Sequence, residues 1–273
     1  LTNNYWLKNK LPNLKVLIAE DNEVNKLLAK RMLEHWGLTY KTAHTGFEVM
    51  ELINTEHFDL VLMDIQMPDK NGIEATREIR NLTDETKKNI PIIALTANAL
   101  KGEEKKYQDV GMNDFLTKPF KEKELFDVLQ RVISNSNSFG SRFSAIETTK
   151  TPDTLNDTDK LYNLSLVNDL AEGNQDFIKS LIQIFIDNTP ADCAAMLAAV
   201  EIQDWEQAGK LSHKLKSTVD TMQIASIKED VRFIELNGKH KTNIEQIPAI
   251  AQKVNEIITA TTAQLKVEFG FTN

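Results

Sequence analysis

A short apolar run that ends in a carboxylate constrains the fold of this chain more than any other feature. Leu60–Met63 is wholly apolar, and the turn-forming segment Pro68–Gly72 follows soon after it. Such a run is typical of a strand buried on both faces, as in a parallel sheet covered by helices. Asp64 stands where the run ends. Because open α/β sheets bind their ligands at the carboxyl ends of the strands, Asp64 is a candidate functional residue.

Four more strand-length runs flank this one, and amphipathic helical segments separate them. Five strands that alternate with five helices predict a parallel, doubly wound sheet with right-handed crossovers. The predicted strands are Lys15–Ala19, Thr39–Ala43, Leu60–Met63, Ile90–Leu95 and Asp114–Thr117, and the predicted helices are Val24–Trp36, Gly46–Asn54, Gly72–Leu82, Leu100–Val110 and Lys121–Ile133.

Polar side chains follow four of the predicted strands directly. They are Glu20 and Asp21, then Asp64, then Thr96, and finally Lys118. One edge of the sheet should therefore gather three carboxylates, a hydroxyl and an amine. Crowded carboxylates raise one another's pKa, and a hard cation such as Mg²⁺ relieves that conflict. A lysine and a hydroxyl beside such a metal suit a phosphoryl group in transfer.

Residues 14–133 resemble the receiver domain of two-component response regulators. The motifs that carry the resemblance are AEDN (19–22), LMDIQMPDKNG (62–72), LTA (95–97) and Lys118-Pro119-Phe120. The resemblance implies a flavodoxin-like α/β fold with Asp64 as the phosphoacceptor. It also implies that Asp21 binds Mg²⁺ together with Asp64, with Glu20 acting through water and the backbone carbonyl of Gln66 completing the protein ligands.

The same resemblance implies roles at the other strand ends. Thr96 and Lys118 would contact the phosphoryl oxygens, and Ala97 would belong to the same binding site. Phe115 matches the switch aromatic that moves when Thr96 is drawn inward. The Lys118–Pro119 peptide bond is expected to be cis.

The composition changes after the first domain. Ser, Thr, Asn and Asp dominate from Ser134 to about residue 160, as in SNSNS (134–138) and TTKTPDT (148–154). Such a segment cannot bury enough apolar surface to fold alone. The predicted organisation is a leader or the end of a preceding domain (1–13), a receiver domain (14–134), a flexible linker (135–160) and a second domain (161–273).

The second domain shows helical periodicity only. Antiparallel helices joined by short loops predict a bundle, so the chain combines an α/β domain with a tethered all-α domain. Pro190 suits the first turn of a helix, which predicts a helix boundary near it. The predicted helices are Leu164–Leu170, Gln175–Asp187, Pro190–Val200, Gln203–Val219, Ile224–Leu236 and Ile247–Leu265.

A histidine in the second domain is a candidate nucleophile. At 3.6 residues per turn, His213 lies about 100° from the seam residue Ser212 and roughly opposite Leu215, which predicts that it points to solvent. Lys216 and Ser217 share its face of the helix. An exposed neutral imidazole is a good nucleophile toward phosphorus.

The segment DWEQAGKLSHKLKST (204–218) resembles the histidine phosphotransfer (HPt) domain, and the similarity covers about residues 161–268. That family is a helical bundle whose exposed histidine accepts a phosphoryl group from one receiver and passes it to another. His213 matches the phosphorylated histidine, and Lys216 matches the lysine three residues on. Ser217 and Gln223 stand where the family usually has glycine, which leaves open how closely a receiver docks.

Composition and charge narrow the classes of function. The net charge of −8, without a dense Lys/Arg cluster, argues against nucleic-acid binding. No apolar run reaches membrane-spanning length, so we expect a cytoplasmic location, or the cytoplasmic part of a membrane-bound sensor kinase. The start at Leu1 suggests a fragment of a longer polypeptide.

Without a glycine-rich nucleotide loop, we expect a covalent phosphoryl carrier rather than an ATP-dependent kinase.

Three functions compete. The first is a phosphorelay module with Mg²⁺, forming the C-terminal part of a hybrid sensor histidine kinase, with a kinase core upstream and another response-regulator receiver downstream. The second is a phosphorylation-controlled receiver with a non-transferring helical docking or dimerisation module. The third is a metal-dependent phosphohydrolase with Asp64 as nucleophile. That class usually has a second acid two residues after the nucleophile, where this chain has Gln66.

Overall fold

The computed structural model describes residues 11–97, 103–134, 160–171 and 173–271. The chain forms two compact units, an α/β unit first and a helical unit after it. The predicted leader and linker fall almost entirely outside the described residues. Within the described part of the chain, no helix combines the length and the apolarity needed to cross a lipid bilayer.

The first unit is built on a parallel five-stranded sheet in the order β2-β1-β3-β4-β5. Every residue of the central strand β3 is buried, which explains its uninterrupted apolar run. The predicted parallel sheet is confirmed. Its strands are β1 (Lys15–Ala19), β2 (Thr39–Ala43), β3 (Leu60–Asp64), β4 (Ile92–Thr96) and β5 (Asp114–Thr117).

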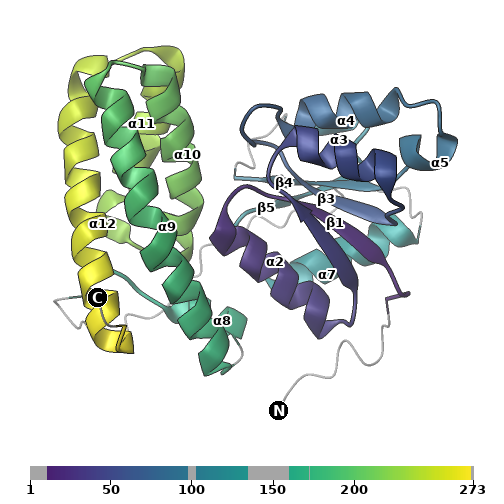
Figure 1. Ribbon diagram of the computed structural model, residues 1–273, viewed down its shortest axis with the longest axis horizontal. Coiled ribbons are helices and arrows are strands. Elements are labelled where there is room, and N and C mark those ends of the chain that lie inside the picture. Colours follow the sequence, from purple (N-terminus) through teal and green to yellow (C-terminus); the bar gives the residue numbers. More distant parts are fainter. Residues whose placement is uncertain (1–10, 98–102, 135–159, 172, 272–273) are drawn as a thin grey trace. The chain divides into compact units, whose positions relative to one another are not determined.

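Helices cover both faces of this sheet. In Figure 1, α2 (Glu23–His35) and α7 (Glu122–Ile133) lie on one face, and α3 (Gly46–Thr55) and α4 (Gly72–Arg80) lie on the other. This layering buries both faces of the central strands and leaves the carboxyl ends of the strands as the edge where polar side chains gather. The unit also contains the shorter helices α5 (Glu85–Lys88) and α6 (Glu103–Asp109).

Some boundaries differ from the prediction for local reasons. The strand predicted from Ile90 begins at Ile92, because Pro91 has no N–H to donate to the sheet. Helix α4 ends at Arg80 rather than Leu82. The one-turn helix α5 has no predicted counterpart, since it is too short to show a helical period. Asp84 caps it by accepting hydrogen bonds from the amides of two α5 residues.

The second unit is helical throughout its described residues. Its four long helices, α9 to α12, pack side by side, and each contacts two of the others. The elements are α8 (Ser165–Ala171), α9 (Gln175–Glu201), α10 (Trp205–Thr221), the 3₁₀ turn η1 (Ala225–Ile227), α11 (Lys228–His240), the 3₁₀ turn η2 (Ile244–Gln246) and α12 (Ile247–Phe269).

Pro190 lies inside α9, so the prediction that two helices meet there is wrong. A proline inside a helix removes one backbone hydrogen bond and costs about 3 kcal/mol. The buried stripe of α9 nevertheless continues past it, from Ile186 and Thr189 to Cys193 and Met196. Because each large apolar side chain contributes about 1.5–3 kcal/mol on burial, packing of this stripe outweighs the cost of the proline.

Helix α10 begins at Trp205 rather than at the predicted Gln203. Gln203 has a φ of 58°, a left-handed conformation that cannot continue an α-helix. Asp204 then caps the helix by accepting a hydrogen bond from the amide of Gln207.

Two facing glycines set the spacing between α10 and α11. A Cβ atom on Gly238 would lie 2.5 Å from the carbonyl oxygen of Trp205 and 3.0 Å from the amide nitrogen of Gly209. Only residues without a side chain let two helix backbones approach so closely. Gly209 precedes His213 by one turn, and Gly238 follows Glu235 by almost one turn. The close crossing therefore lies beside these two residues.

Candidate functional site

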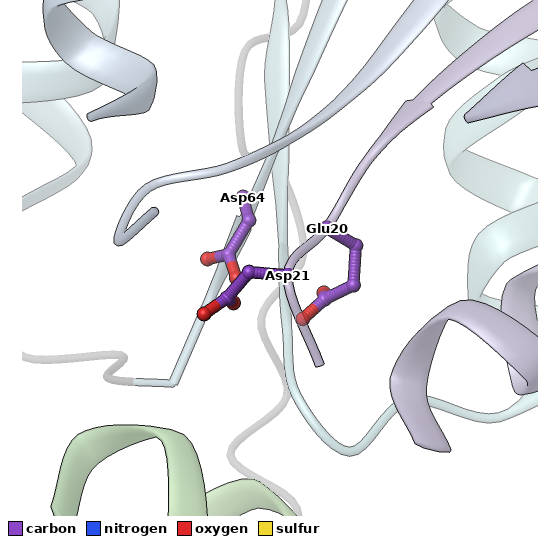
Figure 2. A group of neighbouring side chains, drawn as sticks. All are labelled: Glu20, Asp21 and Asp64. Atoms are coloured by element: carbon purple, nitrogen blue, oxygen red, sulfur yellow. The ribbon is translucent and has the colours of Figure 1, made fainter. Parts of the chain in front are cut away.

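The carboxyl ends of β1 and β3 bring three carboxylates together. Glu20 and Asp21 follow β1 directly, and Asp64 is the last residue of β3. One oxygen of each carboxylate lies within 4.8 Å of the others, and Figure 2 shows the three side chains at the strand ends. The structure thus assembles the acidic group that the strand pattern predicts at this edge.

Lys118 brings a positive charge to the acidic group from the end of β5. Its ammonium donates hydrogen bonds to Oδ2 of Asp64 at 2.7 Å and to Oε2 of Glu20 at 2.9 Å. Asn25 donates to the other oxygen of Glu20 at 3.1 Å. Because the Lys118 side chain is only 4% exposed, water screens these ion pairs little. The Lys118–Pro119 peptide bond is cis, as expected.

The charges of the site perturb one another. Burial and the Glu20 carboxylate raise the pKa of Asp64 well above its ordinary value, and Lys118 only partly opposes that rise. Burial alone would lower the pKa of Lys118, but the carboxylates of Asp64 and Glu20 hold it above its ordinary value. Three carboxylates and one ammonium leave an excess of negative charge, which a bound cation would relieve.

This donor set fits a hard divalent cation. Mg²⁺ prefers oxygen ligands and takes one or two carboxylates while keeping several waters. Glu20 is bonded through both of its oxygens, to Lys118 and to Asn25, whereas Asp21 is the partly exposed member of the group and Asp64 shares the Lys118 ammonium. Asp21 and Asp64 are therefore the side chains suited to direct ligation, with Glu20 behind them.

The backbone after β3 folds tightly against Asp64. The amide of Gln66 donates to Oδ1 of Asp64 at 3.1 Å. A Cβ atom on Gly72, the first residue of α4, would lie only 2.1 Å from the carbonyl oxygen of Asp64. Glycine at position 72 therefore permits the close turn that orients the Asp64 carboxylate.

Thr96, the last residue of β4, is hydrogen-bonded to a tyrosine of α6. Its Oγ1 lies 3.0 Å from the hydroxyl of Tyr107, and that hydroxyl donates to Oε2 of Glu103 at 2.9 Å. The rings of Tyr107 and Phe115 are 6.0 Å apart. Ala97 follows Thr96 in the turn after β4. No motif marks Tyr107 in the sequence, because an aromatic residue in a helix is most often core packing.

His213 in α10 is bonded to a carboxylate from α11. Its Nδ1 lies 2.5 Å from Oε1 of Glu235, and the ammonium of Lys216 donates to Oε2 of the same carboxylate at 2.6 Å. The prediction that His213 points to solvent did not include this carboxylate partner, which belongs to the same helical unit. The helical wheel of one helix could not show that a neighbouring helix presents a carboxylate to this face.

Glu235 is a functional candidate that the sequence did not reveal. Burial acts to raise its pKa, but the bonds to His213 and Lys216 outweigh burial and lower the pKa to about 2. The carboxylate is therefore ionised at neutral pH and can only accept hydrogen bonds. The Nδ1 atom of His213 must then carry the proton that the two groups share. The contact spans two helices, so no local spacing rule predicts it.

The two positions where the HPt family usually has glycine differ in their surroundings. Gln223 has a φ of 50°, the left-handed region that glycine adopts most easily. Its side chain accepts a hydrogen bond from Ser165 at 2.9 Å. Ser217 is buried in α10, where a glycine would remove a small side chain without changing the path of the helix.

Comparison with known proteins identifies the first unit. The family model of the response regulator receiver domain matches residues 16–130. These residues are a receiver domain. Hybrid signal transduction histidine kinase K of Dictyostelium discoideum is 38% identical to the chain over 127 residues, which are 45% of this chain and 10% of that protein. The receiver domain is thus homologous to those of hybrid histidine kinases.

Two further relatives extend the comparison. Signal transduction histidine-protein kinase BarA of Shigella flexneri is 27% identical over 243 residues, which are 89% of this chain and 26% of that protein. A receiver domain of sensor histidine kinase PA1611 from Pseudomonas aeruginosa PAO1, solved with a magnesium ion coordinated in its active site cleft, is 40% identical. The match covers 45% of this chain and 99% of the PA1611 receiver domain, with a TM-score of 0.42. The chain spans 10% and 26% of the two curated relatives.

Proposed function

We propose that this chain is a phosphorelay module in which Asp64 and His213 exchange a phosphoryl group. The observation that carries the proposal is the Lys118 ammonium, which bridges Asp64 and Glu20 in the acidic site of a receiver domain. The alignment with the kinase BarA covers 89% of the chain, so it extends into the helical unit. This supports a shared order of a receiver followed by a helical module.

At the receiver, Asp64 is the proposed nucleophile. A carboxylate oxygen of Asp64 attacks the phosphorus of a phosphoryl donor. The new O–P bond forms as the bond from phosphorus to the leaving oxygen breaks, and the leaving group departs with that electron pair. Lys118 lies 2.7 Å from Asp64 and would pair with the charge on the transferred oxygens. Thr96 would donate its hydroxyl to the same group.

Mg²⁺ is the proposed cofactor. Asp21 and Asp64, with the Gln66 carbonyl, would hold it, and Glu20 would contact it through water. When bound, it supplies charge neutralisation for phosphoryl oxygens. Among the residues that the structure describes, this site has more carboxylates than cations, and that excess of negative charge favours Mg²⁺.

At the helical unit, His213 is the proposed acceptor. Glu235 fixes the ring proton on Nδ1, which places the ring lone pair on Nε2. Nε2 attacks the phosphorus of phospho-Asp64, so that an N–P bond forms, the O–P bond breaks and the Asp64 carboxylate is regenerated. The ionised Glu235 offsets the positive charge of the phosphorylated ring. Lys216, the lysine three residues on, would pair with the phosphoryl oxygens.

The relatives suggest the partners of this module. Because they are histidine kinases, we place a histidine kinase core upstream. The resemblance of residues 204–218 to the HPt domain is the reason for placing a further response-regulator receiver downstream. The parent protein would present both units to the cytoplasm. Both partners are receivers or kinase cores, and neither is a nucleic acid.

Phosphate mapping tests the proposal. The full chain is incubated with acetyl phosphate and MgCl₂, and the phosphorylated residues are located by mass spectrometry. We expect alkali-labile phosphate on Asp64 and acid-labile phosphate on His213. Asp64→Asn should abolish both, and His213→Gln should abolish only the second. His57→Gln, at an exposed histidine of the receiver unit, is the matched control and should change neither.

The competing functions give different results in the same assay. Phosphate that appears on Asp64 but never on His213 would support a receiver with a non-transferring docking or dimerisation module. Steady hydrolysis of small phosphate esters, dependent on Asp64 and without transfer, would support a phosphohydrolase.

A further inference from the structure

Tyr107 contacts both residues that the receiver resemblance assigns to the switch. Its hydroxyl is bonded to Oγ1 of Thr96 at 3.0 Å, and its ring lies 6.0 Å from the ring of Phe115. The side chain is 1% exposed, so these contacts are made inside the core beneath α6. Tyr107 is therefore placed to influence where the Thr96 hydroxyl points.

The direction of the hydrogen bonds follows from the number of protons. Burial and the bond to Glu103 raise the pKa of Tyr107 to about 12, so the phenol keeps its single proton at neutral pH. That proton is donated to the carboxylate of Glu103 at 2.9 Å. The oxygen of Tyr107 must then accept at its contact with Thr96, and Thr96 is the donor. The three groups form a directed chain from Thr96 through Tyr107 to Glu103.

A hydroxyl has only one proton to give. In the proposed function, Thr96 donates that proton to a phosphoryl oxygen on Asp64. The same proton is donated to Tyr107 in this structure, and a well-aligned bond to one acceptor excludes a well-aligned bond to the other. The phosphoryl group and Tyr107 therefore compete for Thr96.

We propose that Tyr107 is a positioning residue that holds the Thr96 hydroxyl away from the phosphoryl site, so that phosphorylation of Asp64 must break the Thr96–Tyr107 hydrogen bond. This inference rests on the proposed function of Asp64. Glu103 supports this role because it accepts the Tyr107 proton, so that the tyrosine oxygen can only accept a hydrogen bond from Thr96. Tyr107 thus sets how readily the receiver takes up its phosphorylated arrangement.

Binding of beryllofluoride, an analogue of the phosphoryl group, tests this role in the full chain. Affinity is measured by NMR titration in MgCl₂. Tyr107→Phe keeps the ring beside Phe115 and removes only the competing oxygen. We expect it to tighten beryllofluoride binding about threefold to tenfold, the effect of one neutral hydrogen bond. Glu103→Ala should act in the same direction, because Tyr107 can then donate to Thr96, whereas the exposed neighbour Glu104→Ala should have no effect.

A double-mutant cycle separates this role from packing. In a Thr96→Ala background, Tyr107→Phe should leave the affinity unchanged, because the proton in competition is gone. The inference about Tyr107 would be overturned, and the proposed function left standing, by either of two results. One is that Tyr107→Phe binds beryllofluoride no more tightly than the wild type does. The other is that Tyr107→Phe raises the affinity equally with and without Thr96. Failure of the wild-type chain to bind beryllofluoride, or equal binding by Asp64→Asn, would overturn the proposed function as well.

Discussion

At the scale of single residues, Lys118 decides the charge balance of the receiver site. Its ammonium bonds to two of three neighbouring carboxylates, Asp64 and Glu20, in a buried position. Removing one partner of a buried ion pair leaves the other charge uncompensated, which typically costs about 3–5 kcal/mol. A bound cation can replace part of that compensation. Stability and metal binding should therefore be linked through Lys118.

We expect Lys118→Ala to unfold at a lower temperature than the wild type in the absence of Mg²⁺. Added MgCl₂ should raise its melting temperature by more than it raises that of the wild type, because the ion relieves a greater repulsion. Phosphorylation by acetyl phosphate should nevertheless be slower. Lys123→Ala, which breaks the exposed pair with Asp127, is the control and should change stability by less than about 1 kcal/mol. An equal response of both variants to MgCl₂ would contradict this charge balance.

A second residue-scale prediction concerns Glu235 and pH. The folded chain lowers the pKa of Glu235 from 4.5 to about 2. A lowered pKa contributes stability that is complete above the unfolded value and is lost as pH falls through the folded value. The stabilising effect of Glu235 should therefore fade between about pH 4.5 and pH 2. Carboxyl NMR titration of the full chain should show a titration midpoint of Glu235 near its folded pKa of about 2. His213→Ala should move this midpoint upward. An unchanged midpoint would show that His213 does not contribute.

The sequence indicated some of these residues and not others. Asp64 and Lys118 were predictable, because Asp64 ends β3, Lys118 follows β5, and parallel strands end at a common edge. Glu235 and Tyr107 were not, because each acts through a contact between separate elements. Sequence periodicity describes one helix or strand at a time and does not predict which residue of another element a side chain contacts.

At the scale of elements, the approach of α10 and α11 is the feature that places His213 against Glu235. The approach depends on Gly238, whose added Cβ would lie 2.5 Å from a backbone oxygen of α10. Backbone atoms cannot move aside as a flexible side chain can. A wider crossing would therefore lengthen the short bond between His213 and Glu235.

We expect Gly238→Ala to destabilise the helical unit, although alanine in place of a helical glycine normally stabilises by about 0.5–1 kcal/mol. Overpacking of this kind costs about 1–3 kcal/mol. Urea titration measures the free energy of unfolding, which should be lower in Gly238→Ala than in the wild type. The pKa of Glu235 should also rise, since the bond to His213 weakens. A stabilised variant with an unchanged Glu235 titration would mean that the crossing has room for a methyl group.

The elements themselves were largely predictable, and the misses have local causes. The predicted strands lie within two residues of the observed ones at each end. The apolar runs of β1, β3 and β4 have few other interpretations. The helix α9 was predicted as two, because the local penalty of Pro190 is visible in the sequence and the buried stripe that outweighs it forms only in the bundle. One-turn elements such as α5 leave no period to detect.

At the scale of the whole molecule, both proposed acceptors belong to one polypeptide. The receiver domain contains Asp64, and the helical unit contains His213. A covalent connection converts a reaction between two modules into an intramolecular one, with an effective concentration that is typically about millimolar. Transfer within a chain should then outpace transfer between chains at micromolar protein.

We predict that phosphoryl transfer from Asp64 to His213 in the intact chain is first order. The receiver is loaded with acetyl phosphate, the donor is removed, and phosphohistidine is followed over a range of protein concentrations. Its half-time of formation should not change with concentration. The control mixes chains carrying Asp64→Asn with chains carrying His213→Gln, so that only transfer between chains remains. Its rate should be slower and should rise with concentration. If the mixture matched the intact chain at low micromolar concentration, transfer would occur between chains or within a preformed dimer, and the covalent connection would contribute nothing to the rate.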